Sequence, residues 1–304
     1  MKTDLITGAF SYSGKYVAKK LLEQGIKVRT LTGHPDRPNP LPGPVEIFPY
    51  RFDSETEMAR AFEGVDTFYN TYYIRFPYGG ATYELAYENN KKLIKAARSA
   101  GIRRIVNISI TNPSADSPFP YFRHKWLIDR AVIDSGISYA IIKPTVIFGY
   151  EDILINNIAW ILRRMPVMAV PGWGDYKIQP VYVEDLAEIM IKAAGLKENV
   201  SWDAVGPDTF TFKELVKLIR SKIPSITFLI LPTPPELFLL AGKLMNPILK
   251  DVILTRDEVY GLMAGLLYSN QPPRAKTRLP DWLAQNRAWI GKHYASELAR
   301  HYCD

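Results

Sequence analysis

A tyrosine and a lysine stand four positions apart in this chain, as Tyr121-x-x-x-Lys125. On a helix this spacing places both side chains on one face. An unperturbed tyrosine titrates near about pH 10, which is too high for an efficient base at neutral pH, but a neighbouring ammonium group stabilises its phenolate. The pair therefore predicts proton transfer to or from a carbonyl or hydroxyl group, with Tyr121 as the acid or base.

A glycine-rich turn near the start of the chain predicts a second part of the same chemistry. The segment LITGAFSYSG, residues 5–14, joins an apolar strand to a helix at 15–24, and a second strand follows at 27–32. Gly8 allows a tight turn, and Gly14 lets the helix begin close to the strand. The backbone N–H groups and the positive dipole end of such a helix suit a pyrophosphate, so the turn predicts a dinucleotide site.

Short apolar strands alternate with helices over the first half of the chain. We expect further strands at 45–49, 66–71, 104–110 and 139–148, with helices at 54–62, 83–100 and 121–135. This alternation predicts an α/β fold with a doubly wound parallel Rossmann sheet, whose ligand lies beyond the carboxyl ends of the strands.

The alternation fades after Gly149, where helices are expected at 153–164, 184–194 and 211–222. We expect an NAD(P)-binding domain at 1–149, to which 178–195 return. A smaller, mostly helical substrate or cap region then covers 150–177 and 196–304.

Composition limits the classes of function. Hydrophobic residues make up 47% of the chain and charged residues 23%, and the net charge is +7. The basic residues are spread out, so we expect a small-molecule substrate and no nucleic acid, and a homodimer stays open. The lone Cys303 forms no internal disulfide, and the histidines show no metal-ligand spacing, so no metal is expected.

Location is predicted from the same features. The chain begins directly with a strand, without the pattern of a signal peptide, and reduced cysteine fits a cytoplasmic protein. The longest apolar stretch, near 237–240, is too short to span a membrane. It is expected to cover a pocket or to meet a partner.

Five landmarks, taken in order, make residues 1–220 resemble the short-chain dehydrogenase/reductase superfamily. The resemblance is to its extended and atypical branches, which are epimerase/dehydratase-like and NmrA-like. The landmarks are the glycine turn, Gly64-Val65-Asp66 to Asn70, the Tyr121–Lys125 pair, Lys143-Pro144-Thr145 to Phe148-Gly149, and Val181-Tyr182-Val183-Glu184-Asp185. The resemblance implies an NAD(P)-dependent oxidoreductase that acts on a carbonyl or hydroxyl of a small, partly apolar substrate.

The resemblance also implies the residues of the site. The catalytic set is Tyr121, Lys125 and a hydroxyl that positions the substrate oxygen, for which Ser109 and Thr111 are both candidates. The implied cofactor contacts are Gly8, Phe10, Ser11, Tyr12, Ser13, Gly14, Thr32, His34, Arg37, Phe52, Asn70, Thr71, Tyr72, Lys125 and Pro144. The implied substrate contacts are Tyr72, Asn156, Asn157 and Trp160.

Some positions depart from the pattern of the superfamily. Ser11 replaces the middle glycine, and we expect its N–H and hydroxyl to face a phosphate. Tyr72 and Tyr73 replace small residues after the fourth strand, so they are expected to crowd the cleft or stack on a ligand.

The end of the second strand bears on the choice of cofactor. The usual acidic residue is absent, and Thr32 stands there. An acid would repel the 2′-phosphate of NADP, and Arg29, His34 and Arg37 lie nearby in the sequence. We therefore expect NADP, with NAD still possible.

Two other functions stay open beside the oxidoreductase. One is a sugar-nucleotide epimerase, which is less favoured because Lys177 stands where an arginine usually holds the diphosphate. The other is a protein that binds NADP(H) structurally or senses its redox state, which several of the departures would suit. The intact Tyr121–Lys125 pair favours catalysis.

Overall fold

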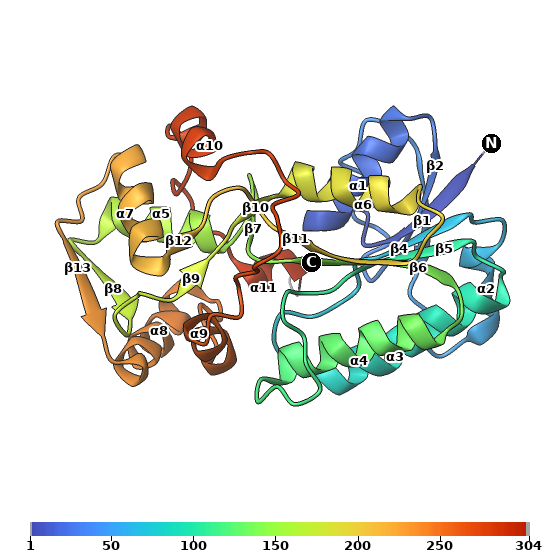
Figure 1. The fold of residues 1–304 in the computed structure, drawn as a ribbon, viewed down its shortest axis with the longest axis horizontal. Helices are drawn as coiled ribbons and strands as arrows, with labels where there is room; N and C mark the ends of the chain where they lie inside the picture. The colour runs from blue at the N-terminus through green and yellow to red at the C-terminus, as the bar shows by residue number, and fades with distance from the viewer. Residues whose placement is uncertain (1, 302–304) are drawn as a thin grey trace. The chain divides into compact units, whose positions relative to one another are not determined.

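The chain folds into two compact units, shown in the computed structural model of Figure 1, which describes residues 2–301. Unit 1 comprises Met1–Pro144 and Val183–Ala204, and unit 2 comprises Thr145–Tyr182 and Val205–Asp304. The prediction about Cys303 lies outside the described residues.

Unit 1 is built on a seven-stranded sheet in the order β11-β6-β5-β4-β1-β2-β3. Every neighbouring pair of its strands is parallel. The strands are β1 (Thr3–Thr7), β2 (Lys27–Thr32), β3 (Val45–Pro49), β4 (Thr67–Asn70), β5 (Arg104–Ile108), β6 (Ser138–Pro144) and β11 (Val200–Ala204). The strand order reverses between β1 and β4, where ligands of such sheets bind, and this confirms the doubly wound fold.

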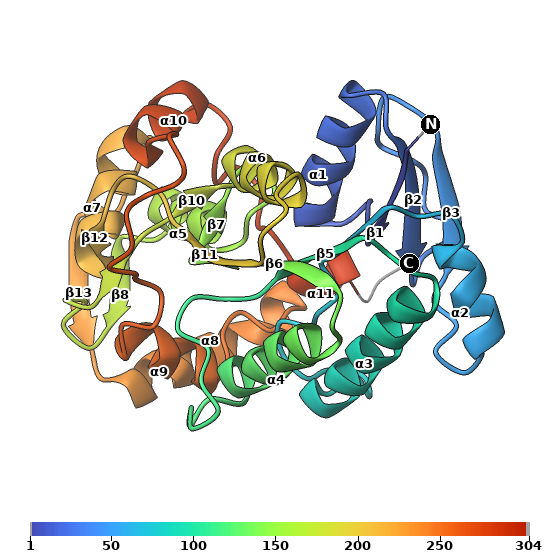
Figure 2. The same ribbon diagram turned by 45° about the vertical axis from the view of Figure 1, so that its right-hand side comes forward.

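Helices cover both faces of this sheet (Figure 2). On one face lie α1 (Tyr12–Glu23) and α6 (Val183–Ala194), and on the other lie α2 (Glu55–Phe62), α3 (Tyr83–Ser99) and α4 (Pro120–Asp134). The apolar stripes of α2 and α3 pack on the sheet through Phe62 and Leu93, which meet Leu5, Phe68 and Ile105 in a fully buried core. Each such side chain contributes roughly 1.5–3 kcal/mol.

Unit 2 combines helices with three two-stranded sheets, β10-β7, β12-β9 and β13-β8. Its strands are β7 (Ile147–Phe148), β8 (Val167–Pro171), β9 (Lys177–Ile178), β10 (Val181–Tyr182), β12 (Phe210–Thr211) and β13 (Leu229–Thr233). Its helices are α5 (Leu154–Arg164), α7 (Phe212–Lys222), α8 (Pro235–Leu249), α9 (Arg256–Met263), α10 (Leu279–Asn286) and α11 (Glu297–His301). The core lies between α5, α7 and α10, around Ile155, Leu215 and Leu283.

Two boundaries differ from the predicted ones. The single strand expected at 139–148 is divided, because β6 ends at Pro144 and β7 pairs with β10 in unit 2. Residues 200–204, expected in the cap, form β11 and extend the sheet of unit 1. The polar residues Ser201 and Asp203 interrupt this strand, so it lacks the apolar run by which the other strands are predicted.

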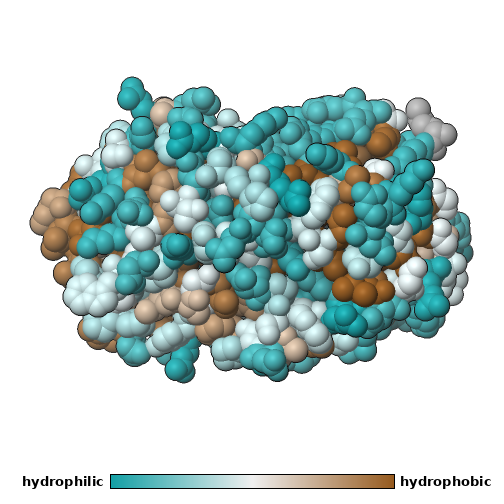
Figure 3. Space-filling model, in the orientation of Figure 1, coloured by the Kyte–Doolittle hydropathy of each residue, from teal (hydrophilic) through white to brown (hydrophobic). Residues whose placement is uncertain are grey.

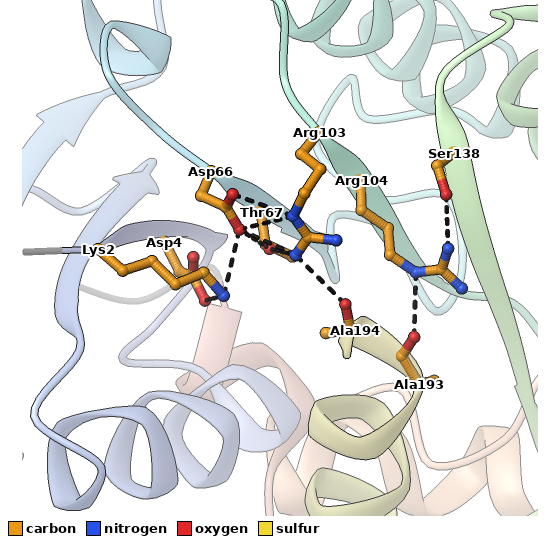
Figure 4. Close-up of polar contacts among 9 residues, drawn as sticks. All are labelled: Lys2, Asp4, Asp66, Thr67, Arg103, Arg104, Ser138, Ala193 and Ala194. Carbon is orange, nitrogen blue, oxygen red and sulfur yellow. Dashed lines mark hydrogen bonds and ion pairs between the residues drawn. The ribbon is translucent and has the colours of Figure 1, made fainter. Parts of the chain in front are cut away.

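Ion pairs join the amino ends of the strands in unit 1 (Figure 4). Arg103 Nη2 lies 2.9 Å from the Asp66 carboxylate, and Lys2 Nζ lies 3.2 Å from the carboxylates of both Asp4 and Asp66. The Arg103 guanidinium holds the pKa of Asp66 far below its usual range. The Asp66 carboxylate is therefore held in its ionised form, whereas burial raises the pKa of Asp4.

Arg104 extends these contacts to α6 and is itself fully buried. Its Nε donates to the Ala193 carbonyl at 3.0 Å, and its Nη2 donates to the Glu198 carbonyl at 2.9 Å. A cation at the carboxyl end of a helix is favoured by the helix dipole, so Arg104 fixes α6 and the segment after it to the sheet.

Candidate active site

The glycine turn after β1 has the geometry that its sequence predicts. Gly8 has a φ of +66°, in the left-handed region that favours glycine. A Cβ atom at Gly14 would lie 2.2 Å from the Gly8 carbonyl oxygen, so this position holds no side chain. The helix therefore begins in direct contact with the turn that leads into it.

Ser11 closes this turn instead of facing a phosphate. Its N–H donates to the Gly8 carbonyl at 2.9 Å, and its hydroxyl donates to the same oxygen at 2.6 Å. Both of these donors are therefore bonded within the turn, and a contact of Ser11 with a phosphate stays a prediction. Within the described chain no side chain caps α1, and its first turn has no acidic residue, so its amino end stays electropositive.

The residues of β2 and of the loop after it divide into two groups. Thr32 Oγ1 accepts from His34 N at 3.1 Å, and Arg37 N donates to the His34 carbonyl at 3.2 Å, which forms a compact loop. Arg29, in contrast, donates to the Glu46 carboxylate at 2.8 Å. It also donates to carbonyls at the end of α2. Arg29 is thus held by β3 and α2, which removes it from the set expected near a 2′-phosphate.

The aromatic side chains of residues that follow β3 and β4 form a cluster at the carboxyl edge of the sheet. The Tyr72 ring centroid lies 5.2 Å from that of Tyr50 and 5.4 Å from that of Phe52. The Tyr72 hydroxyl accepts from Asn89 Nδ2 at 2.8 Å. Tyr72 therefore packs against the residues that follow β3, and the ring that contacts Tyr121 is its neighbour Tyr73.

A row of buried amides runs beside this cluster through the centre of the sheet. Asn70 Nδ2 donates to Asn90 Oδ1 at 2.7 Å and to Asn107 Oδ1 at 2.8 Å. Asn107 Nδ2 in turn donates to Asp129 Oδ1 at 3.0 Å. Asn70 is therefore committed to the protein interior, while Thr71, which follows it, is bonded to Thr7 at the end of β1.

Tyr121 and Lys125 both lie against the ring of Tyr73. Lys125 is buried, and its Nζ donates to the Ile108 carbonyl at 2.9 Å and stands 4.1 Å from the centroid of the Tyr73 ring. The Tyr73 hydroxyl donates to the Tyr121 carbonyl at 3.3 Å, and the centroids of these two rings are 5.2 Å apart. Burial lowers the pKa of Lys125 to about 8, although Asp129 opposes this shift.

Asp129 was not among the predicted site residues, but it joins several of them. Ser109 Oγ donates to its Oδ2 at 2.6 Å, so the candidate hydroxyl at 109 faces this carboxylate. Burial raises the pKa of Asp129 to about 6, against the opposing effect of Ser109 and Lys125. The spacing Tyr121, Lys125, Asp129 places all three on one face of α4, and this signal was available in the sequence. Thr111 is also buried.

The three predicted substrate contacts in unit 2 have partners inside that unit. Asn156 Nδ2 donates to the Asp152 carboxylate at 3.0 Å. Asn157 exchanges two hydrogen bonds with the backbone of Ala295, at 3.0 and 2.8 Å. The Trp160 ring packs against the tyrosine that precedes Ala295, with centroids 5.6 Å apart. These contacts give the three residues a structural role inside unit 2, and a contact with substrate stays a prediction.

Comparisons with known proteins agree with the cofactor part of the site. Residues 8–151 match a family model described as NAD(P)H-binding. The chain is 26% identical over 287 residues to the NADH dehydrogenase [ubiquinone] 1 alpha subcomplex subunit 9, mitochondrial, of Arabidopsis thaliana, covering 87% of this chain and 70% of that protein.

Solved structures share the fold at low identity. An NADPH-dependent quinone oxidoreductase from Escherichia coli, complexed with NADPH, has a TM-score of 0.75 and 17% identity over 92% of this chain and 98% of that one. A nucleoside-diphosphate-sugar epimerase from Staphylococcus aureus has a TM-score of 0.74 and 19% identity over 93% and 100%. The chain therefore carries an NAD(P)H-binding domain, on a fold that epimerases and reductases share.

Proposed function

We propose that this chain is an NADP(H)-dependent oxidoreductase of the short-chain dehydrogenase/reductase type, which acts on the carbonyl or hydroxyl group of a small, partly apolar substrate. One observation carries the proposal: the glycine turn and the Tyr121–Lys125 pair belong to the same edge of one sheet. The turn follows β1, and Lys125 is bonded to Ile108, the last residue of β5. In this proposal, dinucleotide binding and proton transfer share the carboxyl edge of the sheet, at the ends of β1 and β5, with β4 between them.

The glycine turn fits the pyrophosphate of the cofactor, because Gly14 lies against Gly8 and α1 presents an uncapped amino end. When bound, the dinucleotide supplies or accepts a hydride. The missing acid at Thr32 supports NADP over NAD. The residues proposed to hold it are Gly8, Phe10, Tyr12, Ser13, Gly14, Thr32, His34, Arg37, Phe52, Thr71, Lys125 and Pro144.

In this proposal the Tyr121 hydroxyl moves a proton to or from the substrate oxygen, and the Lys125 ammonium stabilises its phenolate. With a pKa of about 8, Lys125 still carries its charge at neutral pH. The ionised carboxylate of Asp129 helps to retain that charge. Ser109, which donates to Asp129, and Thr111 are the two proposed hydroxyls for positioning the substrate oxygen.

Tyr73 covers this pair, since its ring contacts both the Lys125 ammonium and the Tyr121 ring. We expect the Tyr73 ring to turn aside when cofactor and substrate bind, because both catalytic groups must be reached. Replacing the ring by a methyl group should then improve access to the site.

Because the Tyr73 ring covers Tyr121 and Lys125, it also favours a second function, in which the chain binds NADP(H) but catalyses no reaction. The relative in Arabidopsis thaliana is named as a subunit of NADH dehydrogenase, which is consistent with such a role. The epimerase alternative has less support, because Lys177 Nζ, expected to replace a diphosphate-binding arginine, lies 4.8 Å from the centroid of the Tyr268 ring.

The test begins with the affinities for NADPH and NADH, measured by cofactor fluorescence on the full chain. Oxidation of NADPH is then followed with a panel of aldehydes, ketones and quinones. Tyr121→Phe is expected to lower kcat by roughly 10²–10⁴-fold while leaving the affinity for NADPH unchanged. Tyr87→Phe, at a half-buried tyrosine of α3, is the matched control and should keep full turnover.

The alternative outcomes separate the candidates. Full turnover in Tyr121→Phe would contradict the catalytic assignment. NADPH binding without reduction of any acceptor, in the natural chain and in Tyr73→Ala alike, would favour the non-catalytic function. Turnover that rises in Tyr73→Ala would support the covering role of that ring.

A further inference from the structure

Helix α8 is apolar on every side, and none of its residues is buried. Between Pro235 and Leu249 it carries two charged residues, Glu236 and Lys243. A helix that is hydrophobic all round is normally covered by other parts of a protein or by lipid. One side of α8 exposes between 52% and 77% of four aliphatic side chains, which are Leu237, Leu240, Leu244 and Ile248.

The strand before α8 extends this exposed surface. Leu229 and Leu231 point from β13 to the same side, as alternate residues of a strand do, and both are exposed. Figure 3 shows hydrophobic residues along the edge of unit 2 where β13 lies. We call the whole set the apolar face, and it consists of Trp173, Phe228, Leu229, Leu231, Leu237, Leu240, Leu244 and Ile248.

Trp173 and Phe228 are the largest members of the apolar face, and each is 74% exposed. Gly172 N donates to the Thr233 carbonyl at 2.8 Å, which places Trp173 beside the chain that enters α8. Tryptophan is enriched where a protein meets the interface of a membrane, because its ring is apolar and its N–H is polar. Large exposed apolar side chains gathered along one segment of the chain mark an interaction site.

Basic residues accompany the apolar face. Residues 217–250 contain five lysines and arginines but one acidic residue, Glu236. Arg220 Nη1 donates to the Phe228 carbonyl at 3.3 Å, so a guanidinium group stands directly beside an exposed ring. Lys243 lies within α8, and Lys250 follows its last residue; both are exposed.

We propose that the apolar face docks this protein onto the surface of an anionic lipid bilayer. The aliphatic and aromatic side chains enter the interface between headgroups and acyl chains, and the basic residues bind anionic headgroups. A second copy of the chain fits less well, because a symmetric dimer through this face would bring the same basic residues together. Within residues 2–301 no helix is both long and apolar enough to cross a membrane.

The test is sedimentation of the full chain with vesicles. One set is made of phosphatidylcholine alone, and the other of equal parts phosphatidylcholine and phosphatidylglycerol. We expect the chain to bind the anionic vesicles more tightly and to lose that preference at high salt. The double variant Leu244→Glu/Ile248→Glu should weaken binding by at least about tenfold. Both side chains are exposed, so the fold should be preserved, which circular dichroism and NADPH binding will check.

Leu85→Glu is the matched control, because Leu85 is an exposed leucine on α3 of unit 1. It should leave vesicle binding unchanged. Lys243→Glu should weaken binding to the anionic vesicles and leave binding to the neutral ones unchanged. Quenching of tryptophan fluorescence by brominated lipid should fall in Trp173→Phe.

Three outcomes would overturn the proposal. The first is an absence of vesicle binding in the natural chain. The second is equal binding of the natural chain and Leu244→Glu/Ile248→Glu. The third is a dimer in solution that Leu244→Glu/Ile248→Glu converts to a monomer, without vesicle binding by either, which would identify a second copy as the partner.

Discussion

The two edges of the sheet in unit 1 differ in how they shift the pKa values of their titratable side chains. At the amino edge, Arg103 and Lys2 surround Asp66, whose pKa falls far below its usual range. At the carboxyl edge, burial raises the pKa of Asp129 to about 6 and lowers that of Lys125 to about 8. At the amino edge the ion pairs hold Asp66 in its charged form, although burial raises the pKa of Asp4 there. At the carboxyl edge the pKa values of Lys125 and Asp129 lie close to neutral pH, where side chains can exchange protons.

The largest expected effect is at the carboxyl edge, in Gly14→Ala. The added Cβ would lie 2.2 Å from the Gly8 carbonyl oxygen, so either the turn or the start of α1 must shift. We expect the affinity for NADPH to fall by about a hundredfold or more, equivalent to roughly 3 kcal/mol. Isothermal titration calorimetry will measure it. Gly195→Ala, where the nearest atom to the new Cβ is 3.5 Å away, is the control and should bind normally.

Arg104→Met tests the amino edge. The change removes a buried cation, and the carbonyls of Ala193 and Glu198 lose the hydrogen bonds that its guanidinium donates. We expect the free energy of unfolding to fall by on the order of 3 kcal/mol, while the affinity for NADPH of the folded protein stays the same. Urea denaturation and cofactor titration provide the two readouts. Arg98→Met, at an exposed arginine of α3, should change neither quantity. A selective loss of affinity in Arg104→Met would contradict the separation of the two edges.

Asp129→Asn should have a smaller effect, which depends on pH. Because the pKa of Asp129 is raised to about 6, the folded chain holds this proton more tightly than the unfolded chain does. The resulting stability is present below about pH 4 and is lost as the pH rises through 6. The variant should lack this fall, which is on the order of 2 kcal/mol, in urea denaturation between these pH values.

Asp134→Asn provides the control for this profile, since Asp134 is an exposed carboxylate on the same helix. It should keep the fall in stability of the natural chain. Removing the charge of Asp129 should also lower the pKa of Lys125 further, so any turnover should lose its alkaline limb at a lower pH. A fall that persists in Asp129→Asn would assign it to another group.

Much of the fold follows from local patterns in the sequence. Apolar runs and helical spacing locate most strands and helices of unit 1. Gly8 and Gly14 indicate a tight turn, because the backbone there leaves no room for a side chain. The order of strands around β1 follows from the rules of parallel sheets. Such features depend on residues close together in the chain, so a single sequence contains them.

The partners of polar side chains could not be predicted in the same way. Asn157 is bonded to Ala295, which lies 138 positions further along the chain. Ser109 donates to Asp129, and Tyr73 rather than Tyr72 contacts Tyr121. The spacing of residues in the sequence indicates which side chains lie at the same edge of the sheet. Tertiary contacts between distant segments decide which hydrogen-bond donors are already bonded within the protein.

The segment that Arg104 binds has a consequence for how the protein is made. Ala193 and Glu198 emerge from the ribosome long after β5, because the chain first passes through Thr145–Tyr182 of unit 2 before it returns to unit 1. Until then the nascent sheet lacks α6 and β11, and the Arg104 guanidinium lacks both carbonyls. The sheet of unit 1 is therefore completed only once Ala204 has been made, after the whole of Thr145–Tyr182.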